Sequence, residues 1–352
     1  MKNIAIVFGG QSPEHQISIR SARNIIAAID RSLFNIISIG IDRNGKWRLT
    51  NIEKIEKYVS EEGIQLGFAI GNEQPIIRLD DQSPLAIDVL YLVLHGPNGE
   101  DGTVQGLAQL LRLPFIGSDV LASSVVMDKD VTKRLLRQAG IKVAPDRVVY
   151  QHEKDQLDFE EITAELGLPF FIKPARAGSS IGVHRVKDAG AFKAALNDAF
   201  QYDEKLLIEA AIYGRELECA VMGNHVPIAA SSVGEIVTTA EYSFEEKYSG
   251  TSQAKVLIPA VVDKSSLKRL REIALKAYQV TNCAVLTRVD MFLTEEQEIF
   301  VNELNTLPGF TDISVYPKLW EYDDIAQSEL ITKLIDYALE RHERQQALAM
   351  DF

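Results

Sequence analysis

The sequence predicts a multidomain protein of α/β and α+β class that begins with a small parallel-sheet βαβ domain. The chain has 352 residues, and at roughly 100 to 200 residues per domain this length predicts two or three domains. A continuous apolar run from Asn3 to Phe8 is typical of a buried strand, and Gly9-Gly10 and Ser12-Pro13-Glu14 follow it. A strand, a glycine turn and a helix start in this order indicate the first part of a βαβ unit.

The rest of the first third continues the same alternation. Apolar residues recur at helical spacing over 22–29, and the apolar ranges 34–41 and 87–94 are predicted as two more strands. A second unit is predicted to begin near Ala122, with a helix over 131–137. Further strands are predicted over 169–174, 183–186, 205–209, 218–222, 287–293 and 299–304, and further helices over 191–200, 267–278 and 329–341.

Composition and charge narrow the possible partners. The chain is 46% hydrophobic and 25% charged, which is the balance of a folded globular protein. With 37 Lys and Arg against 50 Asp and Glu, its net charge is −13, so neither nucleic acid nor an anionic membrane is an expected partner. Two cysteines without metal-ligand spacing fit a reducing compartment. No signal peptide or apolar span is apparent, so we expect a soluble, cytoplasmic protein.

Acidic residues on a predicted hairpin form the first candidate site. With a turn over 294–298, Asp290 lies opposite Glu303, and Glu303 and Asn305 share one face of their strand. These oxygen donors would suit Mg²⁺ together with substrate phosphates. The alternative is that they are ordinary solvent-facing strand residues. Asn, Asp and Glu are depleted from strands, which favours the metal site.

A glycine-serine loop follows the predicted strand that ends near Lys173. Backbone N–H groups of Gly178-Ser179-Ser180-Ile181-Gly182 can surround phosphate oxygens, with the Lys173 ammonium as a point charge. It is not a Walker loop, because no Gly-Lys-Ser/Thr follows and the next segment is predicted as a strand. A simple hairpin turn is the alternative.

Three weaker signals lie elsewhere in the chain. The segment from Glu209 to Gly214 can bind an adenine edge, and Glu216 can accept hydrogen bonds from ribose hydroxyls, although a structural role for these acids is the alternative. The glycine-rich loop 95–102 follows a predicted strand, where parallel sheets carry ligand loops. Gly309 and Ser314 follow the acidic strand directly. Plain connections and turns are the alternatives for both loops.

Taken together, these motifs resemble the ATP-grasp superfamily and, within it, the D-alanine-D-alanine ligases. The resemblance covers nearly the whole chain, and six motifs in register make it specific. The matching segments are Phe8-Gly-Gly10 with Ser12-Pro-Glu14-His15, His95-Gly96 with Gly99-Glu-Asp-Gly102, Met127-Asp-Lys129, Lys173-Pro-Ala175 with Gly178-Ser-Ser-Ile-Gly182, Arg288-Val-Asp290, and Asn302-Glu-Leu-Asn-Thr-Leu-Pro-Gly-Phe-Thr311.

The resemblance implies a fold, a reaction and a quaternary state. An N-terminal α/β domain over 1–122 would precede two ATP-grasp domains over 123–216 and 217–352, which would clasp ATP between antiparallel sheets. The implied reaction phosphorylates one D-alanine with ATP, and the amine of a second D-alanine then attacks the acylphosphate. The product, D-alanyl-D-alanine, serves peptidoglycan synthesis. Two Mg²⁺ or Mn²⁺ ions and a homodimer are also implied.

The resemblance also implies residue roles. Glu14 would bind the ammonium group of the first D-alanine, and Ser179 and Tyr248 would link Glu14 to a mobile loop over 243–250. Arg288 and the Gly309 N–H would stabilise the tetrahedral intermediate. His95 would lie near the first D-alanine and Ser314 would hold the carboxylate of the second.

The resemblance further implies ligands for ATP and for the metal ions. The residues that would bind ATP are Lys129, Lys173, Ser179, Ser180, Glu209, Ala211, Ile212, Glu216 and Lys247. Those that would bind the metal ions are Asp290, Glu303 and Asn305.

Two alternatives remain. The first is a D-alanine-D-lactate or D-alanine-D-serine ligase of the same family, which would share every phosphate and metal residue. Tyr248 disfavours the lactate ligase, because family members that form the lactate ester have Phe there or a different loop. The second is a nucleotide-binding protein that has lost catalysis. It is motivated by departures from the family pattern: Val285 and Thr287 replace small residues near Arg288, and Glu241 replaces a common adenine-packing aromatic, a role Tyr242 would then take.

Overall fold

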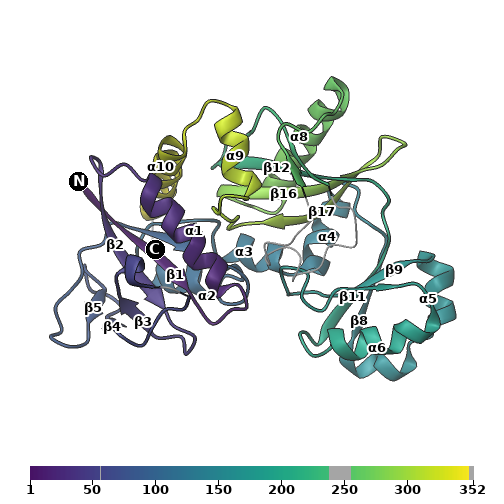
Figure 1. The fold of residues 1–352 in the computed structure, drawn as a ribbon, viewed down its shortest axis with the longest axis horizontal. Helices are drawn as coiled ribbons and strands as arrows, with labels where there is room; N and C mark the ends of the chain where they lie inside the picture. Colours follow the sequence, from purple (N-terminus) through teal and green to yellow (C-terminus); the bar gives the residue numbers. More distant parts are fainter. Residues whose placement is uncertain (56, 238–254, 349–352) are drawn as a thin grey trace.

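The computed structural model describes residues 1–55, 57–237 and 255–348, which fold around three β-sheets (Figure 1). In this view the N-terminal sheet lies on the left, the sheet of the C-terminal half in the upper centre, and the remaining sheet at the lower right. Helices α3 (Val120–Met127) and α4 (Lys129–Gln138) lie between the first sheet and the other two. The three sheets therefore surround a common central region.

The N-terminal sheet is parallel at its centre and antiparallel at one edge. It has the order β5-β4-β3-β2-β1-β6-β7. Strand β1 pairs in parallel with β2 and β6, and β6 with β7, which confirms the predicted parallel sheet. The antiparallel edge of β3, β4 and β5 was not predicted. Parallel pairs need connections of about a dozen residues, so the short segment 42–46 permits only antiparallel pairing. The strands are β1 (Lys2–Gly9), β2 (Phe34–Ile41), β3 (Trp47–Leu49), β4 (Ile64–Phe68), β5 (Ile76–Arg78), β6 (Val89–Val93) and β7 (Phe115–Ile116).

Helix α1 (His15–Ala28) begins slightly later than the sequence predicts. Residues 12–14 form a turn in which the Ser12 hydroxyl accepts a hydrogen bond from the Glu14 N–H at 3.1 Å. In the first turn of the helix, the Ser18 hydroxyl accepts a hydrogen bond from the Gly9 N–H at 2.7 Å. This contact fixes the helix start, and with it Glu14, at the carboxyl end of β1. Two shorter helical elements of this region are η1 (Ile52–Lys54) and α2 (Thr103–Leu110).

The second sheet is antiparallel and has the order β10-β9-β11-β8. Its strands and helix α6 confirm the elements predicted between 169 and 209. Phe159, Phe170 and Phe192 pack against one another in its core, with ring centroids 5.7–6.0 Å apart. The elements are β8 (Asp146–Tyr150), η2 (Gln151–Gln156), α5 (Phe159–Leu166), β9 (Phe170–Pro174), β10 (His184–Val186), α6 (Ala189–Ala199) and β11 (Lys205–Ala210).

The third sheet is also antiparallel and contains the predicted acidic hairpin. Strands β16 and β17 pair Asp290 with Glu303, as the sequence predicts, and they also pair Arg288 with Asn305. An irregularity between Asp290 and Met291 shifts the pairing beyond this point. The elements are β12 (Arg215–Gly223), β13 (Ile228–Ala229), β14 (Gly234–Val237), β15 (Lys255–Leu257), α8 (Lys264–Val280), β16 (Val285–Leu293), β17 (Ile299–Asn305) and α9 (Val315–Tyr322).

The C-terminal helix α10 (Gln327–Gln346) packs back on the N-terminal sheet. Leu330, Leu334 and Ala338 are fully buried in a core shared with residues of β1 and β6. The Arg341 guanidinium donates hydrogen bonds to the carbonyls of Phe115, at 2.8 Å, and Gly117. The first and last parts of the chain therefore share one core. As for every other helix in the described ranges, the length and apolarity of α10 fall short of a membrane span.

We expect Leu334→Ala to lower the free energy of unfolding by about 2–5 kcal/mol, because the truncation leaves a cavity in this shared core. Urea denaturation followed by tryptophan fluorescence measures the loss. Leu348→Ala, at a 68% exposed leucine beyond the same helix, is the matched control and should stay within about 0.5 kcal/mol of the parent. Equal effects of the two substitutions would contradict the packing of α10 on the N-terminal sheet.

Candidate active site

Two adjoining cavities occupy the region between the three sheets. They share several lining residues, including Lys129, Ser179 and Glu303. The larger cavity has a volume of about 520 Å³, which lies within the range of small-molecule sites. Most of the predicted ATP site lines it: Lys129, Lys173, Ser179, Ser180, Glu209, Ala211, Ile212 and Glu216, together with Asp290 and Glu303. The other cavity is lined by Glu14, His95, Ser179, Arg288, Glu303, Asn305, Gly309 and Ser314.

Lysines and the glycine-serine loop form one wall of the larger cavity. Lys129, the first residue of α4, donates a hydrogen bond from Nζ to the Ala177 carbonyl at 2.6 Å and lies 3.5 Å from the Glu303 carboxylate. Ser179 and Ser180 both have positive φ, 52° and 60°, a conformation in which short polar residues occur more readily than branched ones. The loop therefore turns sharply at the junction of the two cavities.

A buried ion cluster supports Lys173 from behind. The Lys173 ammonium lies 2.5 Å from one Glu209 oxygen, and the other Glu209 oxygen contacts the Lys133 ammonium. Lys133 also lies 3.0 Å from Asp146. Burial alone would raise the pKa of Glu209, but Lys173 and Lys133 hold it below its ordinary value. Lys133 and Asp146 were missed in the sequence analysis, because neither belongs to a motif and only the fold brings them together.

Three carboxylates lie side by side where the two cavities meet. Strand pairing aligns Glu218 with Asp290 and Asp290 with Glu303 across β12, β16 and β17. The Arg288 guanidinium pairs with Glu218 and Asp290, and the Lys129 ammonium lies 3.5 Å from Glu303. Carboxylate oxygens are the donors that Mg²⁺ prefers, so this arrangement fits a divalent cation.

Asn305 completes the predicted metal site and also lines the smaller cavity. Within the parts of the chain that the structure describes, no three His, Cys, Asp or Glu side chains converge closely enough to hold a metal alone. Asn305 and oxygens from substrate or water would therefore have to complete a coordination shell around Asp290 and Glu303. Mg²⁺ sites commonly have this composition.

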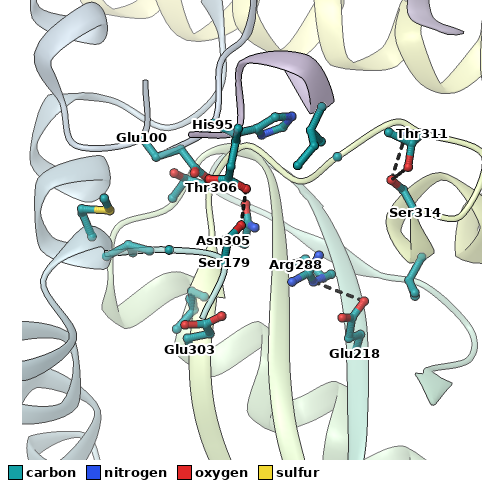
Figure 2. Close-up of a pocket in the computed structure, with 18 of the residues that line it drawn as sticks. His95, Glu100, Ser179, Glu218, Arg288, Glu303, Asn305, Thr306, Thr311 and Ser314 are labelled. Atoms are coloured by element: carbon teal, nitrogen blue, oxygen red, sulfur yellow. Dashed lines mark hydrogen bonds and ion pairs between the residues drawn. The ribbon is translucent and has the colours of Figure 1, made fainter. Parts of the chain in front are cut away.

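Figure 2 shows the smaller cavity, in which Arg288 faces the other polar side chains. The Arg288 guanidinium forms a two-point ion pair with Asp290, at 2.6 and 2.7 Å, and lies 3.2 Å from Glu218. Burial alone would lower the pKa of Arg288, but these carboxylates raise it well above its ordinary value. Arg288 is therefore a fixed positive charge. Sequence reasoning missed Glu218, because its position opposite Asp290 depends on the pairing of β12 with β16.

Other residues that line this cavity come from three separate segments. The Ser179 hydroxyl donates a hydrogen bond to the Glu14 carboxylate, which joins the glycine-serine loop to the start of α1. The Ser314 hydroxyl accepts a hydrogen bond from the Thr311 N–H at 2.9 Å. A Cβ at Gly309 would approach the Ser314 hydroxyl to 2.9 Å, so glycine leaves that loop close to Ser314.

Glu100 and His95 also line this cavity, and both have shifted pKa values. Glu100 accepts a hydrogen bond from the Gly96 N–H at 2.7 Å, yet burial, with the nearby Glu14 charge, raises its pKa to about 8. Burial likewise lowers the pKa of His95. Glu100 is therefore largely protonated at neutral pH. Its segment was noted in the sequence, but the residue was not chosen as a site residue.

The departures near Arg288 are accommodated without displacing it. Val285 is fully buried and has a φ of +69°, which a β-branched side chain adopts only under strain. Thr287 is also buried, and its hydroxyl donates to the Leu286 carbonyl at 2.6 Å. The Arg288 side chain nevertheless lines the cavity. Four residues named in the sequence analysis lie outside the described residues: Glu241, Tyr242, Lys247 and Tyr248.

We expect Glu100→Gln to reduce the pH dependence of stability. Because the pKa of Glu100 is raised to about 8 in the folded protein, the folded chain holds a proton that the unfolded chain has released, and stability falls as pH rises from about 5 to 8. Melting temperatures of the ligand-free protein at pH 6 and 8.5 measure this difference, which should shrink by a few degrees in the variant. The exposed Glu73→Gln serves as control. An unchanged difference in Glu100→Gln would contradict the raised pKa.

Comparisons with known proteins identify relatives along the whole chain. The family model for the D-ala D-ala ligase N-terminus matches residues 3–118, and that for the D-ala D-ala ligase C-terminus matches residues 135–336. A D-alanine-D-alanine ligase of Shouchella clausii is 46% identical, over 99% of this chain and 97% of that protein. D-alanine-D-alanine ligase A of Escherichia coli K12 is 44% identical, over 98% of both.

Two solved structures have a fold closely similar to that of this chain. The D-alanine-D-alanine ligase of Coxiella burnetii has a TM-score of 0.87 at 34% identity, covering 98% of this chain and 96% of that one. The VanG D-Ala:D-Ser ligase of Enterococcus faecalis has a TM-score of 0.83 at 33% identity, covering 96% and 99%. These matches confirm the resemblance noted in the motifs, and the chain belongs to the D-alanine-D-alanine ligase family.

Proposed function

We propose that this chain is an ATP-dependent ligase that joins two D-alanines into D-alanyl-D-alanine for cell wall precursor synthesis. The observation that carries the proposal is the position of Glu303, between a cavity lined by Lys129 and Lys173 and one lined by Glu14 and Arg288. A phosphoryl group moving from a nucleotide to an amino acid has to cross such a junction. Family membership at 44–46% identity supports the same activity.

The reaction has two balanced steps. A carboxylate oxygen of the first D-alanine attacks the γ-phosphorus of ATP, the bond to the β-phosphate oxygen breaks, and ADP leaves. The amine of the second D-alanine then attacks the acyl carbon, phosphate leaves and one amine proton is released. The products are the dipeptide, ADP and phosphate.

On the phosphate side, the role of the protein is positioning and charge neutralisation. Lys129 and Lys173 would contact the ATP phosphates and Lys247 the γ-phosphate, while the segment 209–216 would hold adenine and ribose. Bound Mg²⁺ or Mn²⁺, as two ions in this proposal, would neutralise charge on the transferring phosphoryl group. Asp290, Glu303 and Asn305 would hold these ions, and Arg288, already paired with Asp290, would stay charged beside them.

On the amino acid side, Glu14 would bind the ammonium group of the first D-alanine while Ser179 keeps its carboxylate in place. Arg288 and the Gly309 N–H would stabilise the oxyanion of the tetrahedral intermediate, a contact worth about 3–4 kcal/mol in other enzymes. His95 would lie against the first D-alanine, and Ser314 would bind the carboxylate of the second. We further propose a cytoplasmic homodimer, as the family resemblance implies.

Phosphate release from ATP and Mg²⁺, with product mass, tests the proposal. We expect release with D-alanine and a dipeptide mass, and none with L-alanine. Glu303→Ala should lower turnover more than about a hundredfold, because metal neutralisation is worth several kcal/mol. Lys255→Ala, exposed on β15, should leave it unchanged. Near-normal turnover of Glu303→Ala would exclude the metal assignment, and ATP binding without release would favour a nucleotide-binding protein that has lost catalysis.

Tyr248 is the proposed selector of the second substrate. We expect Tyr248→Phe to admit D-lactate, because family members that form the ester have Phe at this position or a different loop. Product mass from D-alanine with D-lactate measures the change, and D-serine in a parallel reaction tests the remaining alternative. If the variant forms no more ester than the parent, another residue selects the nucleophile.

A further inference from the structure

Lys133 is a buried lysine that the proposed reaction does not use. It lies in α4, four residues after Lys129 and therefore on the same face of the helix. Only 2% of Lys133 is exposed, which is rare for lysine unless the ammonium is paired. Lys129 lines both cavities, whereas Lys133 lies one turn further along, behind the residues that line the larger one.

The neighbours of Lys133 explain its burial. Strand pairing places Asp146 of β8 directly opposite Glu209 of β11, and two like charges in such a pair repel. The Lys133 ammonium contacts both carboxylates, at 3.0 Å for Asp146 and closer for Glu209. Arg137 also pairs with Asp146, but only Lys133 contacts both carboxylates among the ion pairs of the described residues, so it bridges two like charges that the sheet places opposite each other.

Glu209 connects Lys133 to Lys173, which lines the larger cavity. One of its carboxylate oxygens contacts Lys133, and the other lies 2.5 Å from the Lys173 ammonium. Glu209 and Lys173 both line the larger cavity. Without Lys133, Glu209 would turn toward its remaining cation, and the Lys173 ammonium would be drawn onto Glu209 and away from a bound phosphate.

We propose that Lys133 is a positioning residue of the nucleotide site: it holds one oxygen of Glu209, so that the other orients the Lys173 ammonium toward the phosphates. The inference rests on the proposed function only in taking the larger cavity as a nucleotide site. It requires that removing the Lys133 charge weakens nucleotide binding while D-alanine binding is unchanged.

The same contacts give a pH signature. The charged groups that face Lys133 are Asp146 on β8, Glu209 on β11, Lys173 on β9 and Arg137 on α4. Burial lowers the pKa of Lys133 to about 8. Above this pH, a neutral amine no longer holds both carboxylates, so nucleotide affinity should fall. An arginine at this position would stay charged throughout.

Isothermal titration of the full chain with Mg²⁺-ADP, without D-alanine, tests the proposal at pH 7 and 9. Lys133→Met should raise the dissociation constant at pH 7 about tenfold or more, as losing a residue that orients a ligand-binding group does in metal sites. The parent should bind about fivefold more weakly at pH 9 than at pH 7. Lys133→Arg should restore affinity and remove this pH dependence. Arg134→Met, on the exposed face of the same helix, is the matched control.

Several outcomes would overturn the inference. One is a dissociation constant of Lys133→Met within twofold of the parent. Another is an equal increase in the KM values for ATP and for D-alanine, which would indicate a general structural role. If Lys133→Met fails to fold, the dissociation constant of Lys133→Gln and the pH dependence of the parent test the inference instead. A parent dissociation constant that is the same at pH 7 and pH 9 would contradict the inference. A parent that binds no ADP would instead refute the proposed function.

Discussion

The repulsion among three neighbouring carboxylates is the constraint on which the site depends. Pairing of β12, β16 and β17 aligns Glu218, Asp290 and Glu303 in one row, and like charges at such spacing destabilise a sheet. Arg288 and Lys129 offset part of this charge. A divalent cation held by these carboxylates would reduce their repulsion further, and its charge would attract the phosphates of a nucleotide beside it.

Buried ion pairs of opposite charge also connect helix α4 to the second sheet. Asp146, Lys133, Glu209 and Lys173 form, in this order, a chain of alternating sign. Lys205 of β11 bridges Asp128 and Asp130 at the start of α4. Leaving any one of these charges without a partner would be costly, because a buried unpaired ion loses its hydration. The ion pairs thus fix α4 on the second sheet in one register. Lys129, at the first residue of α4, acquires its place between the cavities from these contacts.

The site also needs three sheets to be held together, and hydrophobic packing does this. Helix α10 returns to the N-terminal sheet and buries leucine and isoleucine side chains in a core that also contains Phe310 and Tyr316. Phe310 directly follows Gly309, and its N–H donates to Ser21 of α1 at 3.1 Å. The loop that carries Gly309 and Ser314 is therefore anchored to helix α1, which directly follows Glu14. Packing far from the substrate sets the distance between its proposed binding groups.

The sequence by itself determined about half of the strands and helices, the acidic hairpin and the family, because these depend on local patterns. Periodicity identified these strands, and the register of Asp290 against Glu303 followed from the turn length alone. Only the tertiary structure decided the placement of Glu218, Lys133 and Asp146 in the site and the raised pKa of Glu100. Each of them depends on burial or on pairing between segments distant in the chain, and no local pattern encodes either. The antiparallel edge of the first sheet follows from the short connection between β2 and β3. The return of α10 depends on the core that this helix shares with the N-terminal sheet, which forms only when distant parts of the chain pack together.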